Sequence, residues 1–458
     1  RRQRQMCIRD SAKAGLRTAI VENRRVGGTC LNRGCIPAKA MIHASSLYRE
    51  MQEAEKFGVS AEGITFDYEK IVSYKEETTE KLCQGIEQLL KGNGVTILCG
   101  KGSLEQEHKV KVTGEESEEY YDAEHVILAA GSKPVILPIP GLELPGVLTS
   151  DELFRLKEMP ESLVIIGGGV ISVEFASVYA NLGCKVTIVE AMPRLIPNMD
   201  KEISQNLKMI LKKRGVDIHT SASVQRVEQE GELYTCVFTE KEQEVRVSAQ
   251  YVLCAIGRCP NTEGLFGEGV SPEMERGRIV VDENFQSSLP NVYAIGDLVK
   301  GMQLAHLASA QGMYVAEILA KEAPSVDLAI VPGCVYTDPE IASAGITEDE
   351  AKEKGLEIKT GKFIMSANGK SLITKEERGF IKIVAEKETD VILGAQMMCA
   401  RATDMIGELV TAMTNRMTVQ QLLRGMRAHP TYNEGVQEAL EEILGGAVHV
   451  MPKKKPAK

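Results

Sequence analysis

The sequence lacks the features of a membrane, secreted or nucleic-acid-binding protein. Across its 458 residues no uninterrupted apolar run of about eighteen residues occurs, which is the length from which a spanning helix is inferred. A positively charged start followed by an apolar signal core is also absent, so we expect a cytoplasmic protein with no membrane partner. The net charge of −10 argues against nucleic acid as the main partner.

Clustered cysteines are also scarce. Eleven cysteines are scattered along the chain, and only one pair has a motif-like setting. This distribution excludes a secreted scaffold built on disulfides and suits a reducing compartment with one catalytic disulfide.

A glycine-rich loop is missing where the first nucleotide-binding unit should begin. Residues 12–22 indicate the end of a helix, a tight turn and a buried strand closing on Glu22, which is the second half of a βαβ unit. The first half would be a strand and a glycine-rich loop, but Arg1–Asp10 is polar and contains no glycine. We therefore expect a truncated or foreign start, with roughly 15–20 residues of the unit absent.

Cys30 and Cys35 form the cysteine pair with a motif-like setting, within the segment Gly-Gly-Thr-Cys-Leu-Asn-Arg-Gly-Cys-Ile-Pro-Ala-Lys of residues 27–39. Such a pair can close a small disulfide ring, and the start of a helix would favour a thiolate there. Because thiolates attack disulfides, the pair predicts a redox centre. Two ordinary buried cysteines or half of a zinc site remain alternatives, although a structural zinc site needs four ligands; no metal site is expected.

A second βαβ unit is predicted over residues 163–190. A buried strand runs into Gly167–Gly169, a helical pattern follows at 173–182, and the next strand ends on Glu190. This context makes a glycine-rich motif credible as a nucleotide site, although an ordinary strand–helix loop is the alternative. The third glycine position carries Ser172, which is small enough to preserve helix–sheet packing.

Other elements are predicted from periodicity and turn residues. In the first part of the chain they are a helix at 75–92, strands at 94–98 and 108–113, and strands that run into turns over 126–132, 251–261 and 291–297. The last of these strands leads to Asp297, which is well placed to hold a ligand hydroxyl. A helix N-cap or turn aspartate is the alternative for this residue.

After about residue 333 the pattern changes to that of a separate α+β domain. Its predicted elements are strands at 380–385 and 391–398 and helices at 401–414 and 434–444. Near the end His429 is followed by Glu434, and a carboxylate can orient an imidazole and stabilise its protonated form as an acid–base dyad. An ordinary His-Pro turn is the alternative.

These signals occur together and in a fixed order: the cysteine segment, the second βαβ unit, the Asp297 turn and the His429–Glu434 element. In this the chain resembles the class I pyridine nucleotide–disulfide oxidoreductases along nearly its whole length. The resemblance implies an α/β protein with two Rossmann-like dinucleotide-binding domains and a C-terminal α+β dimerisation domain. The implied parts are an FAD-binding domain (1–145), an NAD-binding domain (146–265), a central segment completing the FAD domain (266–333) and an interface domain with a basic tail (334–458).

The resemblance also implies catalytic roles. Cys30 would be the thiol that exchanges with substrate, and Cys35 the thiolate nearest the flavin. His429 would take the proton of the substrate thiol, with Glu434 orienting it. In this family the dyad reaches the active site of the other subunit, so a homodimer is implied.

Further positions match the cofactor contacts of the family. Lys39 would approach the flavin and pair with Glu174, although two solvated helix charges are the alternative. The FAD-contact positions are Glu22, Gly28, Thr29, Lys39, Gly102, Ala130, Gly131, Ser132, Asp297, Gln303, Leu304, Ala305 and His306. The NAD-contact positions are Gly167, Gly168, Gly169, Val170, Ile171, Ser172, Val173, Glu174, Glu190, Val224 and Gly257. Ala130 departs from the more usual threonine.

Glu190 bears on the choice of nicotinamide nucleotide. A carboxylate accepts the ribose 2′-hydroxyl and repels a 2′-phosphate, which favours NAD over NADP. Arg194, close in sequence, is the one residue that opposes this assignment.

Within the family the chain most resembles the members that oxidise protein-bound dihydrolipoyl groups, with electrons passing through FAD to NAD+. The implied partners are the lipoyl domains of a 2-oxo acid dehydrogenase complex or a glycine cleavage carrier protein. An NAD(P)H-dependent reductase of disulfides or mercury is an alternative, although Glu190 and the absence of a terminal cysteine pair weaken it. An inactive dimeric scaffold is another, because without the first loop the FAD pyrophosphate would lose a helix N-terminus.

Overall fold

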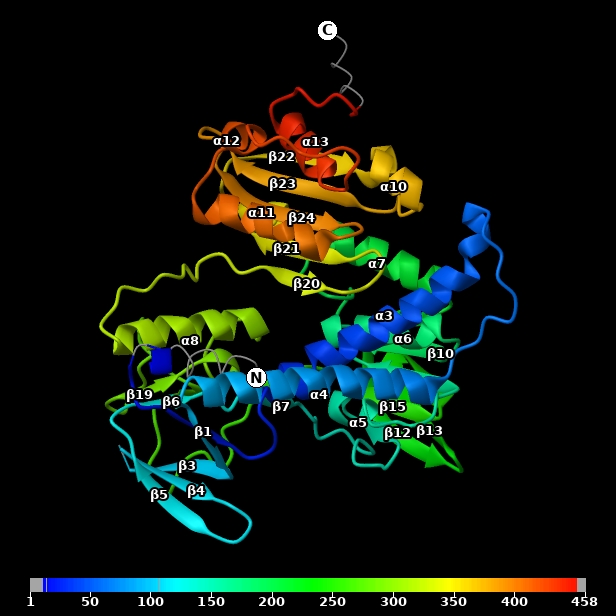
Figure 1. Ribbon diagram of the computed structural model, residues 1–458. Coiled ribbons are helices and arrows are strands. Elements are labelled where there is room, and N and C mark those ends of the chain that lie inside the picture. Colours follow the sequence, from blue (N-terminus) through cyan, green and yellow to red (C-terminus); the bar gives the residue numbers. More distant parts are fainter. Residues whose placement is uncertain (1–10, 14, 107, 451–458) are drawn as a thin grey trace. The chain divides into compact units, whose positions relative to one another are not determined.

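The computed structural model describes residues 11–450 except positions 14 and 107 (Figure 1). The expectation of a truncated or foreign start at Arg1–Asp10 therefore lies outside the described residues. The chain divides into two compact units, and the four-part division inferred from the resemblance remains a prediction. The first unit holds the described residues up to Gly167 together with Asn181–Val186 and Ser223–Leu328, and the second holds Gly168–Ala180, Thr187–Ala222 and the residues from Ala329 onward.

The first unit opens with the strand and helices that carry the cysteine pair. Strand β1 (Ala19–Glu22) pairs in parallel with β2 (Thr96–Cys99). In the sequence, these two strands are separated by α2 (Gly28–Arg33), α3 (Cys35–Gln52) and α4 (Tyr68–Gly92). Helix α4 begins seven residues before the predicted 75–92 because Asp67 caps it, accepting a hydrogen bond from the Lys70 N–H at 3.1 Å.

Strand β1 is less buried than predicted. Only Ile20 is buried, where it packs with Val26, Leu90 and Val95, whereas Ala19 is exposed. Among the described residues the pairing partner of β1 is β2.

The rest of the first unit brings two turns together. Strand β6 (Val126–Leu128) pairs in parallel with β19 (Val292–Ala294). Because parallel strands end at the same edge, the glycine turn after β6 and the aspartate turn after β19 become neighbours. Other strands of this unit form small separate sheets. One contains β3 (Lys101–Gln106), β4 (Lys109–Thr113) and β5 (Glu118–Asp122), and another β12 (Ala222–Glu230), β13 (Leu233–Glu240) and β14 (Gln243–Ala249). Two further sheets are the pairs β7 (Ser132–Pro134) with β16 (Arg258–Pro260), and β17 (Met274–Glu275) with β18 (Arg278–Ile279).

The predicted second βαβ unit is present. It consists of β9 (Ser162–Ile166), α6 (Val170–Asn181) and β10 (Lys185–Glu190). The five-stranded sheet that contains β9 has the order β11-β10-β9-β15-β8, with β11 (Asp217–Thr220), β15 (Tyr251–Cys254) and β8 (Val147–Leu148). The strand order reverses at β9, which is where open α/β sheets bind nucleotides.

The C-terminal part of the second unit is the predicted α+β domain. Its antiparallel sheet has the order β20 (Gly333–Val335), β21 (Ile341–Gly345), β24 (Ile392–Met398), β23 (Phe380–Glu386) and β22 (Ile358–Ile364). Helix α13 (Glu434–Ile443) packs on β22 and β23, and α11 (Ala402–Thr414) packs on β21 and β24 (Figure 1). The core between them is built from buried Ile, Leu, Val, Met and Ala side chains, as the alternating strands predict.

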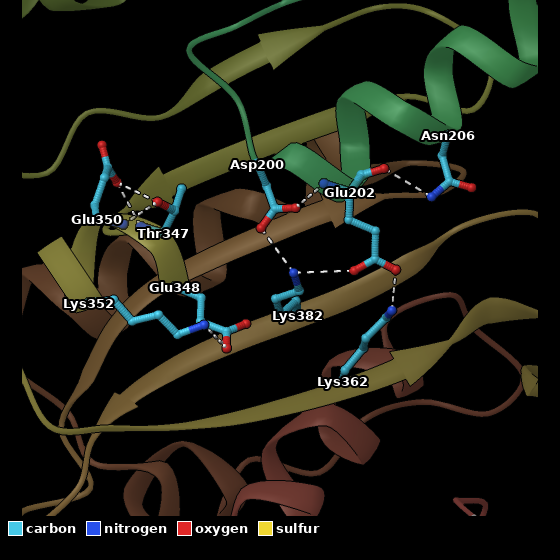
Figure 2. A network of polar contacts seen from close by, with 9 residues as sticks. All are labelled: Asp200, Glu202, Asn206, Thr347, Glu348, Glu350, Lys352, Lys362 and Lys382. Atoms are coloured by element: carbon cyan, nitrogen blue, oxygen red, sulfur yellow. Dashed lines mark hydrogen bonds and ion pairs between the residues drawn. The ribbon is translucent and has the colours of Figure 1, made fainter. Parts of the chain in front are cut away.

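An ion-pair cluster with a buried centre, Lys382 and Asp200, joins this sheet to the start of α7 (Lys201–Lys213) within the second unit (Figure 2). Lys382 of β23 has a side chain only 9 % exposed, and its Nζ lies 3.0 Å from Asp200 and 3.3 Å from Glu202. Lys362 of β22 also donates to Glu202. Burial would lower the pKa of Lys382, but Asp200 and Glu202 outweigh it and raise that pKa. Lys382 therefore stays charged, in a cluster that no sequence motif predicted.

In the part of the chain that the structure describes, no helix combines the length and apolar character needed to cross a bilayer.

Candidate active site

The cysteine pair lies at the junction of two helices. Cys30 is in α2, Gly34 interrupts the helical run, and Cys35 is the first residue of the long helix α3. A Cβ at position 34 would approach the Thr29 carbonyl oxygen to 3.0 Å, so glycine allows this close turn. The positive end of the α3 dipole favours a thiolate at Cys35. Both cysteines are half-buried, and their joining in a disulfide remains a prediction.

Two residues that the sequence did not single out, Asn32 and Cys83, stabilise the cysteine segment by hydrogen bonds. The Asn32 side chain donates to the Val26 and Gly28 carbonyls at 3.0 Å each. Its oxygen accepts from the thiol of Cys83, a fully buried residue of α4, at 3.2 Å. Burial raises the pKa of Cys83, so this thiol stays protonated and acts as a structural donor.

The predicted FAD positions after β6 and β19 form a buried polar cluster. The Ser132 hydroxyl donates to Asp297 at 2.5 Å, and Asp297 is 1 % exposed. Arg258, which the sequence did not predict as a site residue, donates from Nε to the Ser132 hydroxyl at 2.8 Å and from Nη2 to the Ser132 carbonyl at 2.7 Å. The N-cap alternative for Asp297 is wrong, because Ile295 occupies the N-cap of the short helix η2 (Gly296–Leu298).

An unsatisfied buried donor lies in the same predicted set. The side-chain nitrogen of Gln303 is buried and has no hydrogen-bond partner among the described residues, and buried polar groups are rarely left without one. Gln303 and Leu304 precede α8 (Ala305–Leu319), so Ala305 and His306 form its first turn. A bound polar group at this helix start would satisfy the donor, and these residues therefore fit FAD.

The remaining predicted FAD positions lie on the same unit. Glu22 ends β1, Gly28 and Thr29 open α2, and Lys39 is half-buried in α3. The other three are Gly102 in β3, and Ala130 and Gly131 after β6.

The predicted NAD loop, Gly167–Gly169, is hydrogen-bonded to Glu190, the acid at the end of β10. The N–H of Gly168 donates to Glu190, and the other Glu190 oxygen accepts from the Met192 N–H at 2.5 Å. A Cβ on Gly168 would lie 2.7 Å from Leu195 and 2.9 Å from Glu190, whereas one on Gly169 would meet nothing within 4 Å. The loop is therefore packed at Gly168 and open at Gly169. A pyrophosphate needs such open space to approach the backbone closely.

Arg194 is hydrogen-bonded within its own segment. Its guanidinium donates to the Pro197 carbonyl at 2.7 Å, so it is engaged by its own segment. The carboxylate of Glu190, by contrast, contacts the loop through the Gly168 N–H, and its role in nucleotide choice remains a prediction.

The other predicted NAD positions lie on helix α6, in a strand or in turns. Glu174 is 5 % exposed and accepts from the Tyr336 N–H at 3.0 Å, so the alternative of a solvated helix charge is wrong for this residue. Its pairing with Lys39 remains a prediction. The others are Gly167 before α6, Val170, Ile171, Ser172 and Val173 within α6, Val224 in β12, and Gly257 after β15.

His429 and Glu434 form the predicted pair. His429 Nδ1 lies 2.8 Å from one Glu434 oxygen, and the Thr431 N–H donates to the other at 2.8 Å. Burial would raise the pKa of Glu434, but the hydrogen bonds from Thr431 and His429 outweigh it and lower that pKa. With Nδ1 engaged, Nε2 of this largely exposed ring is the nitrogen that can accept a substrate proton. The geometry favours the dyad over an ordinary His-Pro turn.

Comparison with known proteins places this site in a family. Residues 6–312 match the family described as pyridine nucleotide-disulphide oxidoreductase, and residues 331–440 match the dimerisation domain of that family. The chain belongs to the pyridine nucleotide-disulphide oxidoreductases. The predicted resemblance and fold class are thereby confirmed, and the cofactors of the protein are those of its family, FAD and NAD(H).

Individual relatives cover nearly the whole chain. A dihydrolipoyl dehydrogenase of Bacillus subtilis is 39 % identical over 443 residues, covering 96 % of this chain and 94 % of the relative. One from Geobacillus stearothermophilus is 39 % identical over 445 residues, covering 97 % and 94 %.

Solved structures agree with the fold. LpdA from Mycobacterium tuberculosis has a TM-score of 0.89 at 25 % identity, with 96 % of each chain covered. The HOCl-induced flavoprotein disulfide reductase RclA from Escherichia coli has a TM-score of 0.86 at 28 % identity, covering 96 % of this chain and 97 % of RclA.

Proposed function

We propose that the protein is a dihydrolipoyl dehydrogenase, which oxidises protein-bound dihydrolipoyl groups to the cyclic disulfide and reduces NAD+ to NADH. The observation that carries this proposal is the pairing of His429 with Glu434 at 2.8 Å in a chain that also starts a helix at Cys35. A thiol substrate needs a base to become a nucleophile, and a disulfide needs a leaving group that is stable as a thiolate. The 39 % identity to dihydrolipoyl dehydrogenases supports the same substrate.

The chain's residues divide the exchange into two steps. His429 takes the proton of one substrate thiol, and the resulting thiolate attacks Cys30 of the Cys30–Cys35 disulfide, so that Cys35 leaves as a thiolate. The second substrate thiol then attacks the substrate sulfur of the mixed disulfide. The sulfur–sulfur bond of the cyclic disulfide forms, the bond to Cys30 breaks, and the departing Cys30 sulfur takes up the proton of the second thiol. The substrate loses two electrons and the cysteine pair gains two. When bound, FAD supplies the two-electron transfer that links the cysteine pair to NAD+.

The proposed cofactor contacts follow from the buried polar groups. Asp297 and Ser132 would hold FAD hydroxyls, and the unsatisfied nitrogen of Gln303 would find its partner on the cofactor. Gly167–Gly169 would face the NAD pyrophosphate, with Glu190 binding the ribose hydroxyls.

The proposed assembly is a homodimer in the cytoplasm that serves lipoyl-bearing proteins. The dimerisation domain supports two copies, in which the dyad of one subunit would serve the cysteine pair of the other. The scattered cysteines suit a reducing compartment. The partners would be lipoyl domains of a 2-oxo acid dehydrogenase complex or a glycine cleavage carrier protein.

Anaerobic titration with dihydrolipoamide tests the proposal. The flavin-loaded protein should develop long-wavelength absorbance as thiolate forms beside the flavin, and added NAD+ should then yield NADH. A flavin-loaded protein that forms no NADH would overturn the proposed activity. A protein that purifies without flavin absorbance and takes up no added FAD would favour the scaffold alternative.

A further inference from the structure

A short helix touches the segment between His429 and Glu434 at two points. The helix is α10 (Gly369–Thr374), and its N-cap is Asn368, which is 3 % exposed. The Asn368 side-chain oxygen accepts from the Ser371 N–H at 2.9 Å, and its nitrogen donates to the Thr431 carbonyl at 3.0 Å. One buried amide therefore both starts the helix and clamps the His429–Glu434 segment.

The far end of α10 makes the second contact. The hydroxyls of Thr374 and Tyr432 lie 2.7 Å apart, and the Tyr432 hydroxyl also donates to Glu376. Burial and the hydrogen bond to Glu376 raise the pKa of Tyr432 to about 12. Tyr432 therefore keeps its proton at neutral pH, and the contact is maintained under assay conditions.

The hydrogen bond from Asn368 reaches Thr431, the residue that contacts the carboxylate of Glu434. Thr431 receives the Asn368 bond at its carbonyl and gives its own N–H to Glu434 at 2.8 Å. Glu434 in turn holds Nδ1 of His429 at 2.8 Å. Asn368 is thus linked to the imidazole through two intervening residues.

Packing within one subunit does not replace this link. The side chain of His429 is 78 % exposed in the single chain, so apolar groups of its own subunit do not fix the direction of the ring. Its orientation depends on hydrogen bonds, and misplacing a catalytic group by about 1 Å can cost on the order of a hundredfold in rate.

We propose that Asn368 is a positioning residue for the His429–Glu434 dyad. In this proposal helix α10, which Asn368 caps, holds the Asn368 side chain in place. This inference rests on the proposed function, because it takes His429 as the base for the substrate thiol. It concerns a residue that no sequence motif identified and that lies 63 positions before its partner Thr431.

The test compares Asn368→Ala and Asn368→Asp with wild-type holoenzyme. Aspartate can still accept from Ser371 and cap α10, but it has no proton to donate to the Thr431 carbonyl. We expect both variants to lose about 10- to 100-fold in kcat for dihydrolipoamide oxidation. NADH-driven reduction of an artificial flavin oxidant, which needs no thiol deprotonation, should stay at the wild-type rate in both.

A double variant separates positioning from general damage. If Asn368 acts through His429, then adding Asn368→Ala to His429→Gln should reduce thiol oxidation no further. Asn415→Ala is the matched control, because this exposed amide also donates to a backbone carbonyl, that of Thr411 at 2.9 Å, and should leave both activities unchanged.

The outcomes are distinguishable. Wild-type holoenzyme that does not oxidise dihydrolipoamide would overturn the proposed function itself. Active wild type with unimpaired Asn368→Asp, or additive losses in the double variant, would overturn the positioning role alone. Equal loss of the thiol and flavin-oxidant activities in Asn368→Asp would also count against it.

Discussion

The N–H of Gly168 donates a hydrogen bond to the carboxylate of Glu190. Glu190, the acid predicted to select NAD over NADP, is therefore hydrogen-bonded to the glycine loop that would bind the pyrophosphate. The second carboxylate oxygen accepts from the Met192 N–H at 2.5 Å, which fixes the charge at the end of β10. A nucleotide that entered this loop would meet a positioned carboxylate rather than a mobile one.

We accordingly predict a preference for NAD+ over NADP+. The carboxylate of Glu190 repels a 2′-phosphate, and Arg194, the nearby cation, is engaged by the Pro197 carbonyl. The ratio of kcat/KM for the two nucleotides measures the preference, and Glu190→Gln should reduce it. Equal or reversed use of NADP+ by the wild type would show that Arg194 or another basic group dominates.

Replacing either redox cysteine should abolish activity without unfolding the protein. Cys30→Ser and Cys35→Ser each remove one sulfur of the pair, and serine is close in size. We expect dihydrolipoamide oxidation to be lost while FAD content and melting temperature stay near those of the wild type. Cys99→Ser, at an exposed position of β2, is the control that should keep full activity. Near-normal turnover by a flavin-loaded Cys30 or Cys35 variant would refute the redox assignment.

The substitution His429→Gln should slow thiol oxidation by about 10²–10⁴, the usual contribution of a positioned general base. Glutamine can still donate to Glu434 but cannot take up a proton. NADH-driven reduction of an artificial flavin oxidant should change far less. A parallel fall of both activities would mean that His429 has a structural role instead.

The buried cation Lys382 should matter for stability. In Lys382→Met, Asp200 loses its buried ion-pair partner, and breaking such a pair costs roughly 3–5 kcal/mol. Because Glu202 keeps Lys362, we expect the lower end of that range, measured by denaturant unfolding. Lys352→Met, which removes an exposed pair with Glu348, should cost less than about 1 kcal/mol. A cost for Lys382→Met no larger than that of Lys352→Met would contradict the importance of the buried cluster.

The ion pairs of Lys382 also predict that the stability of the folded protein decreases at alkaline pH. The pKa of Lys382 is raised in the folded protein, so its contribution to stability is complete below the unfolded value of about 10.4. The contribution is lost as pH rises through the higher folded value. The stability of the wild type should therefore fall more steeply than that of Lys382→Met at alkaline pH. Parallel pH profiles would rule out Lys382 as the source.

Local patterns in the sequence were sufficient for the elements that carry chemistry. The helix start at Cys35, the strand–glycine–helix unit ending on Glu190 and the His429–Glu434 pair each lie within a few tens of residues, so their spacing reports their geometry. Element boundaries were less accurate. Helix α4 starts at Tyr68 rather than at residue 75, because the Asp67 cap precedes the clear apolar repeat.

The sequence by itself thus determined the family, the fold class and the residues that a motif contains. Only the tertiary structure decided which distant side chains support them: Asn368 with Thr431, 63 positions apart, Arg258 with Ser132, 126 apart, and Lys382 with Asp200, 182 apart. The physical reason is that each of these contacts consists of one or two directional hydrogen bonds, or an ion pair, between elements far apart in the chain. No periodicity links such partners, and they become neighbours only when burial of the apolar faces brings their elements together.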